Sequence, residues 1–194
     1  RSTLFPYTTL FRSTFVRKFG LNEKYALVGL RGNYLSDEVL DDIEKHFSER
    51  DIQCVAFPVL TPSQLQYSKK IELPLNPIYW YALIKYAQAY IGNNMHPIVI
   101  SLHNAVPCYS IDNWGTTNFW GKRIDDGSSK VQDILGRYGL EANRSVITDG
   151  HCDVTADEIF KALDAFDKNK VAEISRAQYE RYAKMMDKCL KALV

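Results

Sequence analysis

The sequence predicts an α/β protein with a Rossmann-like, doubly wound parallel sheet. Short apolar runs recur along the chain and end near glycine, proline or asparagine, as buried parallel strands do. Between these runs lie segments whose apolar residues recur at helical spacing. Strands that alternate with helices form a parallel sheet with helices on both faces. The predicted strands cover residues 25–30, 52–57, 89–92, 107–111 and 144–148.

The first strand and the helix after it show this pattern clearly. The apolar run 25–30 leads into the turn sequence of residues 31–33. Ser36 or Asp37 can cap the next helix, because a short polar side chain accepts a hydrogen bond from a free backbone N–H group. A helix over residues 37–49 is predicted by apolar residues at helical spacing, namely Leu35, Val39, Ile43 and Phe47.

The middle of the chain is rich in aromatic residues and punctuated by proline. The aromatic segment 78–87 is predicted to be a buried helix. Pro97 follows two asparagines, a pattern typical of the first turn of a helix, and it predicts a helix over residues 96–104. The β-branched run 98–100 would also suit a strand. A loop rich in glycine, asparagine and tryptophan is expected over residues 112–127.

Three helices are predicted in the last third of the chain. Ser128 or Ser129 caps a helix over residues 130–138. Thr155 and Glu158 have the spacing of a capping box and predict a helix over residues 156–166. A long charged helix closes the chain at about residues 169–192. Its large apolar residues are expected to pack against the protein, namely Tyr179, Tyr182, Met186 and Leu190.

Composition restricts the classes of function. The chain has 24 basic and 23 acidic residues among 194, whereas a nucleic-acid-binding domain usually has a basic excess. We therefore expect no nucleic-acid partner. No apolar run reaches the roughly 18 residues of a membrane span, so no transmembrane segment is predicted. The four cysteines form no Cys-x-x-Cys pair, which favours reduced thiols in a cytoplasmic protein and argues against a zinc site. No cofactor is expected.

Polar loops follow three predicted strands, at the edge where α/β sheets bind ligands. Arg31 follows the first strand, and its planar guanidinium suits a carboxylate or a phosphate. Asn94 and His96 follow the strand 89–92, at the start of a helix whose backbone N–H groups suit an anion. Ser129 and Lys130 repeat this arrangement after the strand 107–111. These five residues are the candidate substrate-binding and catalytic residues, and no metal site is expected.

Each candidate has a structural alternative. Arg31 could pair with an acidic side chain, and His96 could simply form hydrogen bonds at the start of its helix. Lys130 could be a solvated residue of its helix. His103 lies seven residues after His96. We interpret it as structural, not as a partner of His96 in binding a metal.

The segment 88–115 resembles the signature of the polysaccharide pyruvyl transferase family. It contains a strand that ends in Ile91-Gly92, then an Arg-x-His position, a helix, and a proline, Pro107, that opens the next strand. The ending Gly29-Leu30-Arg31 and the downstream segment 128–135 are also similar to that family. The resemblance covers about residues 20–192. The arginine of Arg-x-His is Asn94 here, which keeps hydrogen-bonding capacity and loses the charge.

This resemblance implies a fold and an activity. The fold would be similar to that of two-domain glycosyltransferases of the GT-B type, with residues 25–194 as the C-terminal domain and closing helix. The activity would be transfer of a pyruvyl group from phosphoenolpyruvate to a sugar or lipid-linked saccharide, as a cyclic ketal, in bacterial exopolysaccharide or cell-envelope synthesis. Arg31 would then bind the anionic donor. His96 would act as acid or base, or as a hydrogen-bond donor to phosphate.

The first residues suggest a different origin. Residues 3–13 resemble the conceptual translation of a sequencing adapter, so we interpret residues 1–13 as foreign to the enzyme. The alternative is an aromatic-rich strand. Residues 14–24 are expected to be a linker or the end of a truncated N-terminal part. With an N-terminal domain missing, the fragment is expected to be inactive alone, because a GT-B-type site lies between two domains.

Two other classes of function stay open. One is a GT-B-type glycosyltransferase or sugar-nucleotide epimerase domain. It would need a carboxylate for the ribose of a nucleotide, and Asp112 is the candidate. The other is a non-catalytic domain of the same fold, which the substitution at Asn94 would favour.

Overall fold

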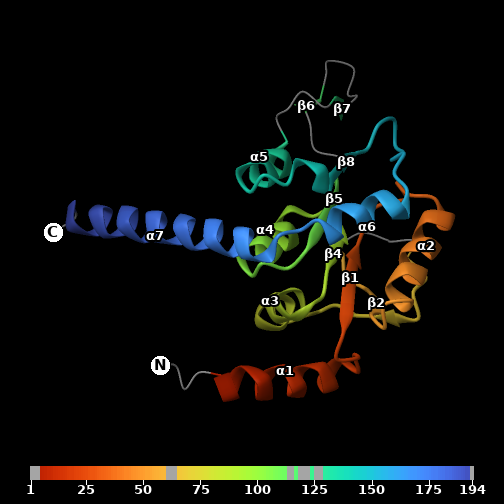
Figure 1. Ribbon diagram of the computed structural model, residues 1–194, viewed down its shortest axis with the longest axis horizontal. Helices are drawn as coiled ribbons and strands as arrows, with labels where there is room; N and C mark the ends of the chain where they lie inside the picture. Colours follow the sequence, from red (N-terminus) through yellow and green to blue (C-terminus); the bar gives the residue numbers. More distant parts are fainter. Residues whose placement is uncertain (1–4, 60–64, 113–115, 118–122, 125–128, 193–194) are drawn as a thin grey trace.

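The computed structural model describes residues 5–59, 65–112, 116–117, 123–124 and 129–192. In this part of the chain, six strands form one sheet in the order β3-β2-β1-β4-β5-β8 (Figure 1). Every neighbouring pair is parallel. The predicted doubly wound parallel α/β fold is therefore confirmed. The strands are β1 (Tyr25–Gly29), β2 (Gln53–Ala56), β3 (Lys69–Lys70), β4 (Tyr90–Gly92), β5 (Cys108–Asp112) and β8 (Arg144–Val146).

Strand β1 shows how the sheet is buried on both faces. Tyr25 and Leu27 belong to one core, and Ala26 and Val28 belong to the other. All five residues of the strand are buried. Because helices cover both faces, the strand is apolar along its whole length and does not alternate between apolar and polar residues.

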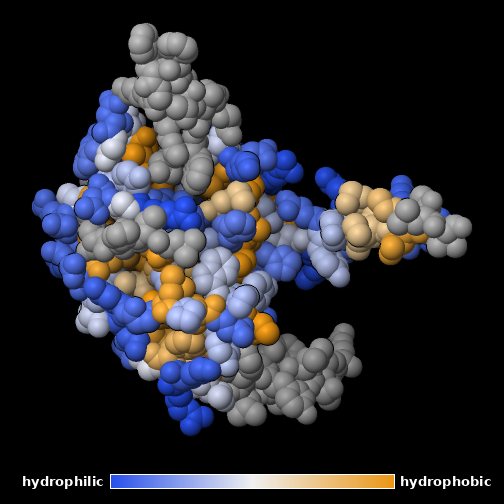
Figure 2. All heavy atoms as spheres, turned by 180° about the vertical axis from the view of Figure 1, so that it is seen from behind, coloured by the Kyte–Doolittle hydropathy of each residue, from blue (hydrophilic) through white to orange (hydrophobic). Residues whose placement is uncertain are grey.

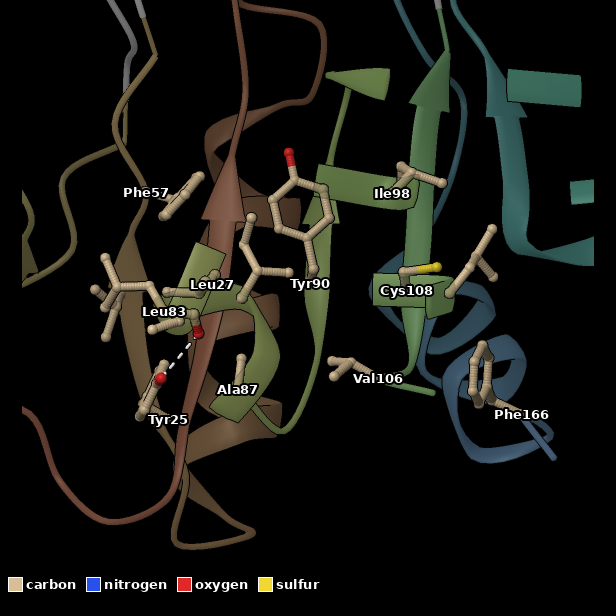
Figure 3. Close-up of a cluster of buried hydrophobic side chains, with 14 of the residues drawn as sticks. Tyr25, Leu27, Phe57, Leu83, Ala87, Tyr90, Ile98, Val106, Cys108 and Phe166 are labelled. Atoms are coloured by element: carbon tan, nitrogen blue, oxygen red, sulfur yellow. Dashed lines mark hydrogen bonds between the residues drawn. The ribbon is translucent and has the colours of Figure 1, made fainter. Parts of the chain in front are cut away.

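The helices divide between the two faces of the sheet. The core with Tyr25 is covered by α1 (Phe5–Phe19), α3 (Pro77–Tyr86), α4 (Met95–His103), α5 (Lys130–Arg137) and the start of α7 (Lys168–Ala192). The other core is covered by α2 (Asp37–Ser48) and α6 (Ala156–Asp164). Figure 3 shows the first core, where the hydroxyl of Tyr25 donates a hydrogen bond of 2.8 Å to the carbonyl of Leu83.

The predicted helix caps are present. Ser36 accepts a hydrogen bond from the N–H of Val39 at the start of α2. Ser129 caps α5 in the same way. Thr155 and Glu158 form both hydrogen bonds of the capping box at the start of α6. These caps stabilise the helices by satisfying N–H groups that have no partner within the helix.

Several short elements differ from the prediction. Strand β3 consists of two lysines at the edge of the sheet, where charged residues are common and no apolar pattern marks a strand. A 3-10 helix covers Glu141–Asn143. Within the predicted loop 112–127, β6 (Thr116–Thr117) and β7 (Arg123–Ile124) pair in antiparallel fashion.

The N-terminal segment is helical. Residues 5–13 form the first turns of α1, so the alternative of a strand is wrong. Phe15 and Val16 are buried in the core, and the ring of Phe15 lies 5.9 Å from that of Tyr79 in α3. After α1, Gly20 has a φ of +58°, a left-handed conformation that glycine adopts readily.

Helix α7 extends beyond the body of the protein (Figure 1). At its start, Val171 and Ser175 are buried, and the hydroxyl of Ser175 donates to the carbonyl of Leu102 in α4. The prediction that the later apolar residues pack against the protein is wrong for the described residues, because the helix has by then left the body. We call these exposed residues the apolar stripe of α7: Tyr179, Tyr182, Met186 and Leu190.

Figure 2 shows hydrophobic surface on this projecting helix. Among the described residues, no helix combines the length and the hydropathy needed to cross a membrane.

Candidate functional site

The strand order reverses between β1 and β4. The chain passes from β1 to β2 and β3 on one side, and then continues through β4, β5 and β8 on the other. In open α/β sheets, the ligand crevice lies at such a reversal, outside the carboxyl ends of the strands. Gly29 and Gly92 end these two strands and pair in register. The loops that carry Arg31 and residues 93–96 therefore leave the sheet side by side.

Asn93 joins these two loops. Its side-chain oxygen accepts a hydrogen bond from the N–H of Arg31, and its side-chain nitrogen donates to the carbonyl of Arg31, both at 2.9 Å. The backbone N–H of Asn93 donates to the carbonyl of Gly29 at 3.3 Å. Asn93 is buried. These bonds extend the pairing of β1 with β4 past the end of both strands.

Tyr90 forms the floor beneath the loops. Its side chain is fully buried, and its hydroxyl points toward the carboxyl ends of the strands (Figure 3). The hydroxyl donates to the carbonyl of Gly29 at 3.4 Å. Burial raises the pKa of Tyr90, while hydrogen bonding from Asn94 and the charge of Arg31 act in the opposite direction. Tyr90 is thus a neutral phenol at physiological pH and can donate a hydrogen bond, but it is unsuited to act as a base.

Arg31 is half-buried at this edge. No ion pair joins it to an acidic side chain in the part of the chain that the structure describes. Its Nε atom is buried and has no hydrogen-bond partner among the described residues. A buried N–H group without a partner costs free energy, which a bound anion would recover.

Asn94 and His96 mark the start of α4. Asn94 occupies the position before the helix, but its side chain makes no capping hydrogen bond to the first turn. His96 is exposed in that first turn and forms no hydrogen bond or ion pair with another described residue. His96 and Arg31 thus follow neighbouring parallel strands at the same edge of the sheet, and no described hydrogen bond joins them. His103 lies at the opposite end of α4.

Ser129 and Lys130 lie beside the end of β5, the next strand after β4. The hydroxyl of Ser129 donates to Asp112 and accepts from the N–H of Gln132, so both its functions are structural. Asp112 also pairs with Nε of Arg144 at 2.8 Å and is 1% exposed. The carboxylate of Asp112 is thus closed to a ribose hydroxyl. Lys130 is exposed.

Sequence reasoning missed three residues here. Asn93 and Asn94 are chemically identical neighbours, and only the geometry shows that Asn93 turns inward. Tyr90 reads as a core residue, since nothing in the sequence reports where its hydroxyl points. Arg144 opens a predicted strand, and its pairing with Asp112 depends on the register of β5 with β8.

Two other possibilities find no support at this edge. No group of three or more potential metal ligands occurs among the described residues. A surface hollow of about 590 Å³ lies elsewhere, around the end of α2 and the start of β2. Its lining includes the acidic residues Asp41, Glu44 and Asp51, which would repel a phosphorylated ligand.

The chain matches one family model and is similar to several solved structures. A family model described as polysaccharide pyruvyl transferase matches residues 3–115, more than half of the chain, including Arg31 and His96. No curated protein matches the sequence.

Similar solved structures include a UDP-GlcNAc 2-epimerase from Methanocaldococcus jannaschii, with 12% identity and a TM-score of 0.48 over 88% of this chain and 49% of that chain. The glycosyltransferase SnogD from Streptomyces nogalater has 14% identity and a TM-score of 0.46, over 80% of this chain and 39% of that chain. The spinosyn forosaminyltransferase SpnP has 19% identity and a TM-score of 0.47, over 81% of this chain and 40% of that chain. This chain spans less than half the length of each.

Proposed function

This chain belongs to the polysaccharide pyruvyl transferase family, and on that premise we propose that it is part of an enzyme that transfers a pyruvyl group from phosphoenolpyruvate to a sugar. Two sugar hydroxyls add to the central carbon of the donor, and phosphate leaves. One hydroxyl proton goes to the methylene carbon and the other to the phosphate, so the product is a cyclic ketal. The observation that carries this proposal is Arg31, whose buried Nε has no partner among the described residues.

The reaction sets three chemical requirements. The carboxylate and phosphate of the donor need a cation and hydrogen-bond donors. The methylene carbon needs an acid, and the incoming hydroxyl needs a base. We propose that Arg31 binds the carboxylate or phosphate of the donor, with Asn94 as a second hydrogen-bonding group. Lys130 supplies a further positive charge from the start of α5. Ser129 acts indirectly, since it fixes the start of the helix that carries Lys130.

His96 is the proposed acid or base. Its imidazole is exposed in the first turn of α4, where nothing in the described part of the chain engages it. Proton transfer in an enzyme is effective when water is excluded, so a second domain would have to cover this position. We therefore propose that the chain alone binds the donor without turnover. The acceptor would be a sugar or a lipid-linked saccharide, reached with the help of an N-terminal domain.

Other features of the chain bear on its cellular location and on the alternative functions. Free cysteines support a cytoplasmic enzyme, and no cofactor is required by the proposed chemistry. A glycosyltransferase or epimerase of GT-B type is less well supported, because the buried Asp112 is engaged by Arg144 and Ser129. The absence of charge at Asn94 is the observation that would favour a non-catalytic domain.

Isothermal titration tests the donor. We expect phosphoenolpyruvate to bind and uridine diphosphate-sugars not to bind. Arg31→Ala should weaken phosphoenolpyruvate binding by about 1.5–3 kcal/mol, the range for hydrogen bonds to charged groups. Arg137→Ala is the matched control, since Arg137 is exposed and pairs with Asp133 in its own helix. Preferential binding of the nucleotide sugar would support the glycosyltransferase instead.

Kinetics of an intact family enzyme that carries this domain test His96. His96→Asn should reduce turnover far more than donor binding if the imidazole moves a proton in the transition state. Equal losses in both would identify His96 as a phosphate ligand. Phosphate release by this chain alone, with an acceptor sugar present, would contradict the need for a second domain.

A further inference from the structure

We propose that Asn93 is a positioning residue that fixes the direction in which Arg31 leaves the sheet, an inference that rests on the proposed role of Arg31 in binding the anionic donor. Asn93 makes two hydrogen bonds to the backbone of Arg31, one as acceptor and one as donor, both at 2.9 Å. A primary amide offers an acceptor and a donor side by side, as a peptide group does. The side chain of Asn93 thus replaces the next residue of a paired strand.

Among the described residues, Asn93 is the hydrogen-bond partner of the Arg31 backbone on both its N–H and its carbonyl. Strand β1 ends at Gly29, and the described pairing of β1 with β4 ends at the Gly29–Gly92 pair. Beyond a strand, a loop has no ladder to hold it and is commonly mobile. Asn93 bonds to the chain on both sides of Leu30: its side chain pairs with the backbone of Arg31, and its own N–H donates to the carbonyl of Gly29. It is 3% exposed, so water cannot easily take over these hydrogen bonds.

Positioning matters because no described ion pair holds the guanidinium in place. Arg31 has no ion pair among the described residues, and its buried Nε has no hydrogen-bond partner there. The described hydrogen bonds of Arg31 are thus made by its backbone, and they fix the point from which its side chain extends. A site that holds its charged group in place before binding spends less free energy on ordering it when the ligand arrives. The two bonds of Asn93 supply that order.

Asn143 provides a matched control. It is also 3% exposed, and its side-chain nitrogen donates to the carbonyls of Cys108 and Ala162 at 3.0 and 3.2 Å. Like Asn93, it is a buried asparagine that bridges backbone segments. It precedes β8 and thus lies toward the amino ends of the strands, away from Arg31. Asn143→Ala should lower the melting temperature to a similar extent as Asn93→Ala.

The test measures phosphoenolpyruvate binding and melting temperature for four variants of the full chain: Asn93→Ala, Asn143→Ala, Arg31→Ala and the double variant Asn93→Ala/Arg31→Ala. We expect Asn93→Ala to weaken binding about tenfold, as a small misplacement of a charged group can. Asn143→Ala should leave binding within about twofold of the wild type. In the Arg31→Ala background, Asn93→Ala should add no further weakening. Additive losses, or equal losses from Asn93→Ala and Asn143→Ala, would overturn the proposal.

A second readout separates this inference from the proposed function. Hydrogen exchange of the Arg31 backbone amide should be slow in the wild type and fast in Asn93→Ala, because its acceptor has been removed. If the wild type binds no phosphoenolpyruvate, the proposed function fails, and slow exchange that depends on Asn93 still supports the positioning role. Unchanged exchange at Arg31 in Asn93→Ala would overturn the positioning role whatever the chain binds.

Discussion

The hydroxyl of Tyr90 occupies the space that a side chain on Gly92 would need. A Cβ atom at position 92 would overlap this hydroxyl and also the carbonyl oxygen of Gly29 on the neighbouring strand. Both obstacles arise because β1 and β4 end together with Gly29 opposite Gly92. Glycine at 92 thus allows a buried tyrosine to reach the carboxyl edge of the sheet, directly beneath Asn94.

The first prediction concerns this glycine. Gly92→Ala should destabilise the protein by about 3 kcal/mol or more, because the Gly29 carbonyl belongs to the backbone and cannot move aside. Tyr90→Phe in the same chain should not restore stability, since that carbonyl remains. Gly136→Ala is the control: the nearest obstacle there is Oε1 of Glu141 at 3.7 Å, and alanine favours the helix. Urea unfolding measures all three, and a mild effect at Gly92 would contradict the packing described.

The second prediction concerns the charge at position 94. Asn94→Arg should tighten phosphoenolpyruvate binding about tenfold, because it adds a charge-assisted hydrogen bond beside Arg31. His103→Arg adds the same charge at the far end of α4 and should have little effect, since solvent and salt screen it. Titration of both variants with phosphoenolpyruvate at physiological salt shows whether the added charge acts only near Asn94 or at any position on the protein. Equal tightening in both would argue against an anion site at Asn94.

The third prediction concerns the buried ion pair beside the site. Arg144→Ala should cost about 3–5 kcal/mol, because it removes a cation that pairs with the buried Asp112 carboxylate. The double variant Asp112→Asn/Arg144→Ala should cost less than the sum of the two single changes. Arg137→Ala, which breaks an exposed pair with Asp133, should cost under about 1 kcal/mol. Chemical denaturation provides the comparison, and strict additivity at 112 and 144 would contradict a coupled pair.

The fourth prediction concerns pH. Hydrogen bonds from the backbone N–H and the hydroxyl of Thr155 lower the pKa of Glu158 below its ordinary value of 4.5. A group whose pKa is lower in the folded state stabilises the fold above its unfolded pKa, and this contribution is lost as the pH falls through the folded pKa. Melting temperature should therefore fall less steeply with acidification in Glu158→Gln than in the wild type. Glu180→Gln, at an exposed position without a described partner, should leave the slope unchanged.

The fifth prediction concerns the N-terminal segment. Deletion of residues 1–13 should change the free energy of unfolding by less than about 0.5 kcal/mol if these residues are foreign to the fold. Deletion of residues 1–16 also removes the buried Phe15 and Val16 and should cost at least about 3 kcal/mol. Denaturation of the two truncated chains compares them directly. A large loss from the shorter deletion would show that the first turns of α1 belong to the protein.

The sequence predicts the framework well because burial leaves a local pattern. The apolar run Tyr25–Val28 and the capping pair Thr155–Glu158 involve residues that are neighbours along the chain. Strand ends are predictable for the same reason, so Arg31 and His96 could be assigned to one edge. Strand β3 escapes prediction because two lysines at a sheet edge leave no apolar signal.

The contacts within the site could not be predicted in this way. The bonds of Asn93 to Arg31 depend on the register of β1 with β4, and those residues are 62 positions apart. The pairing of Asp112 with Arg144 depends in turn on the register of β5 with β8. For α7, helical spacing identifies the apolar face, but it does not report where the body of the protein ends. Tyr179 is therefore exposed where packing was predicted.

The projecting helix α7 carries a cysteine that thiol reagents can reach. Of its four cysteines, Cys54, Cys108 and Cys152 are buried, and burial raises the pKa of the first two to about 12 and that of the third to about 11. Alkylating reagents react with the thiolate, which these three cysteines scarcely form at neutral pH, so their thiols are unreactive there. Cys189 is exposed on α7, next to Leu190 of the apolar stripe. A maleimide dye therefore labels the unmodified protein at Cys189. The fluorescence of that dye should change when another molecule covers the apolar stripe of α7.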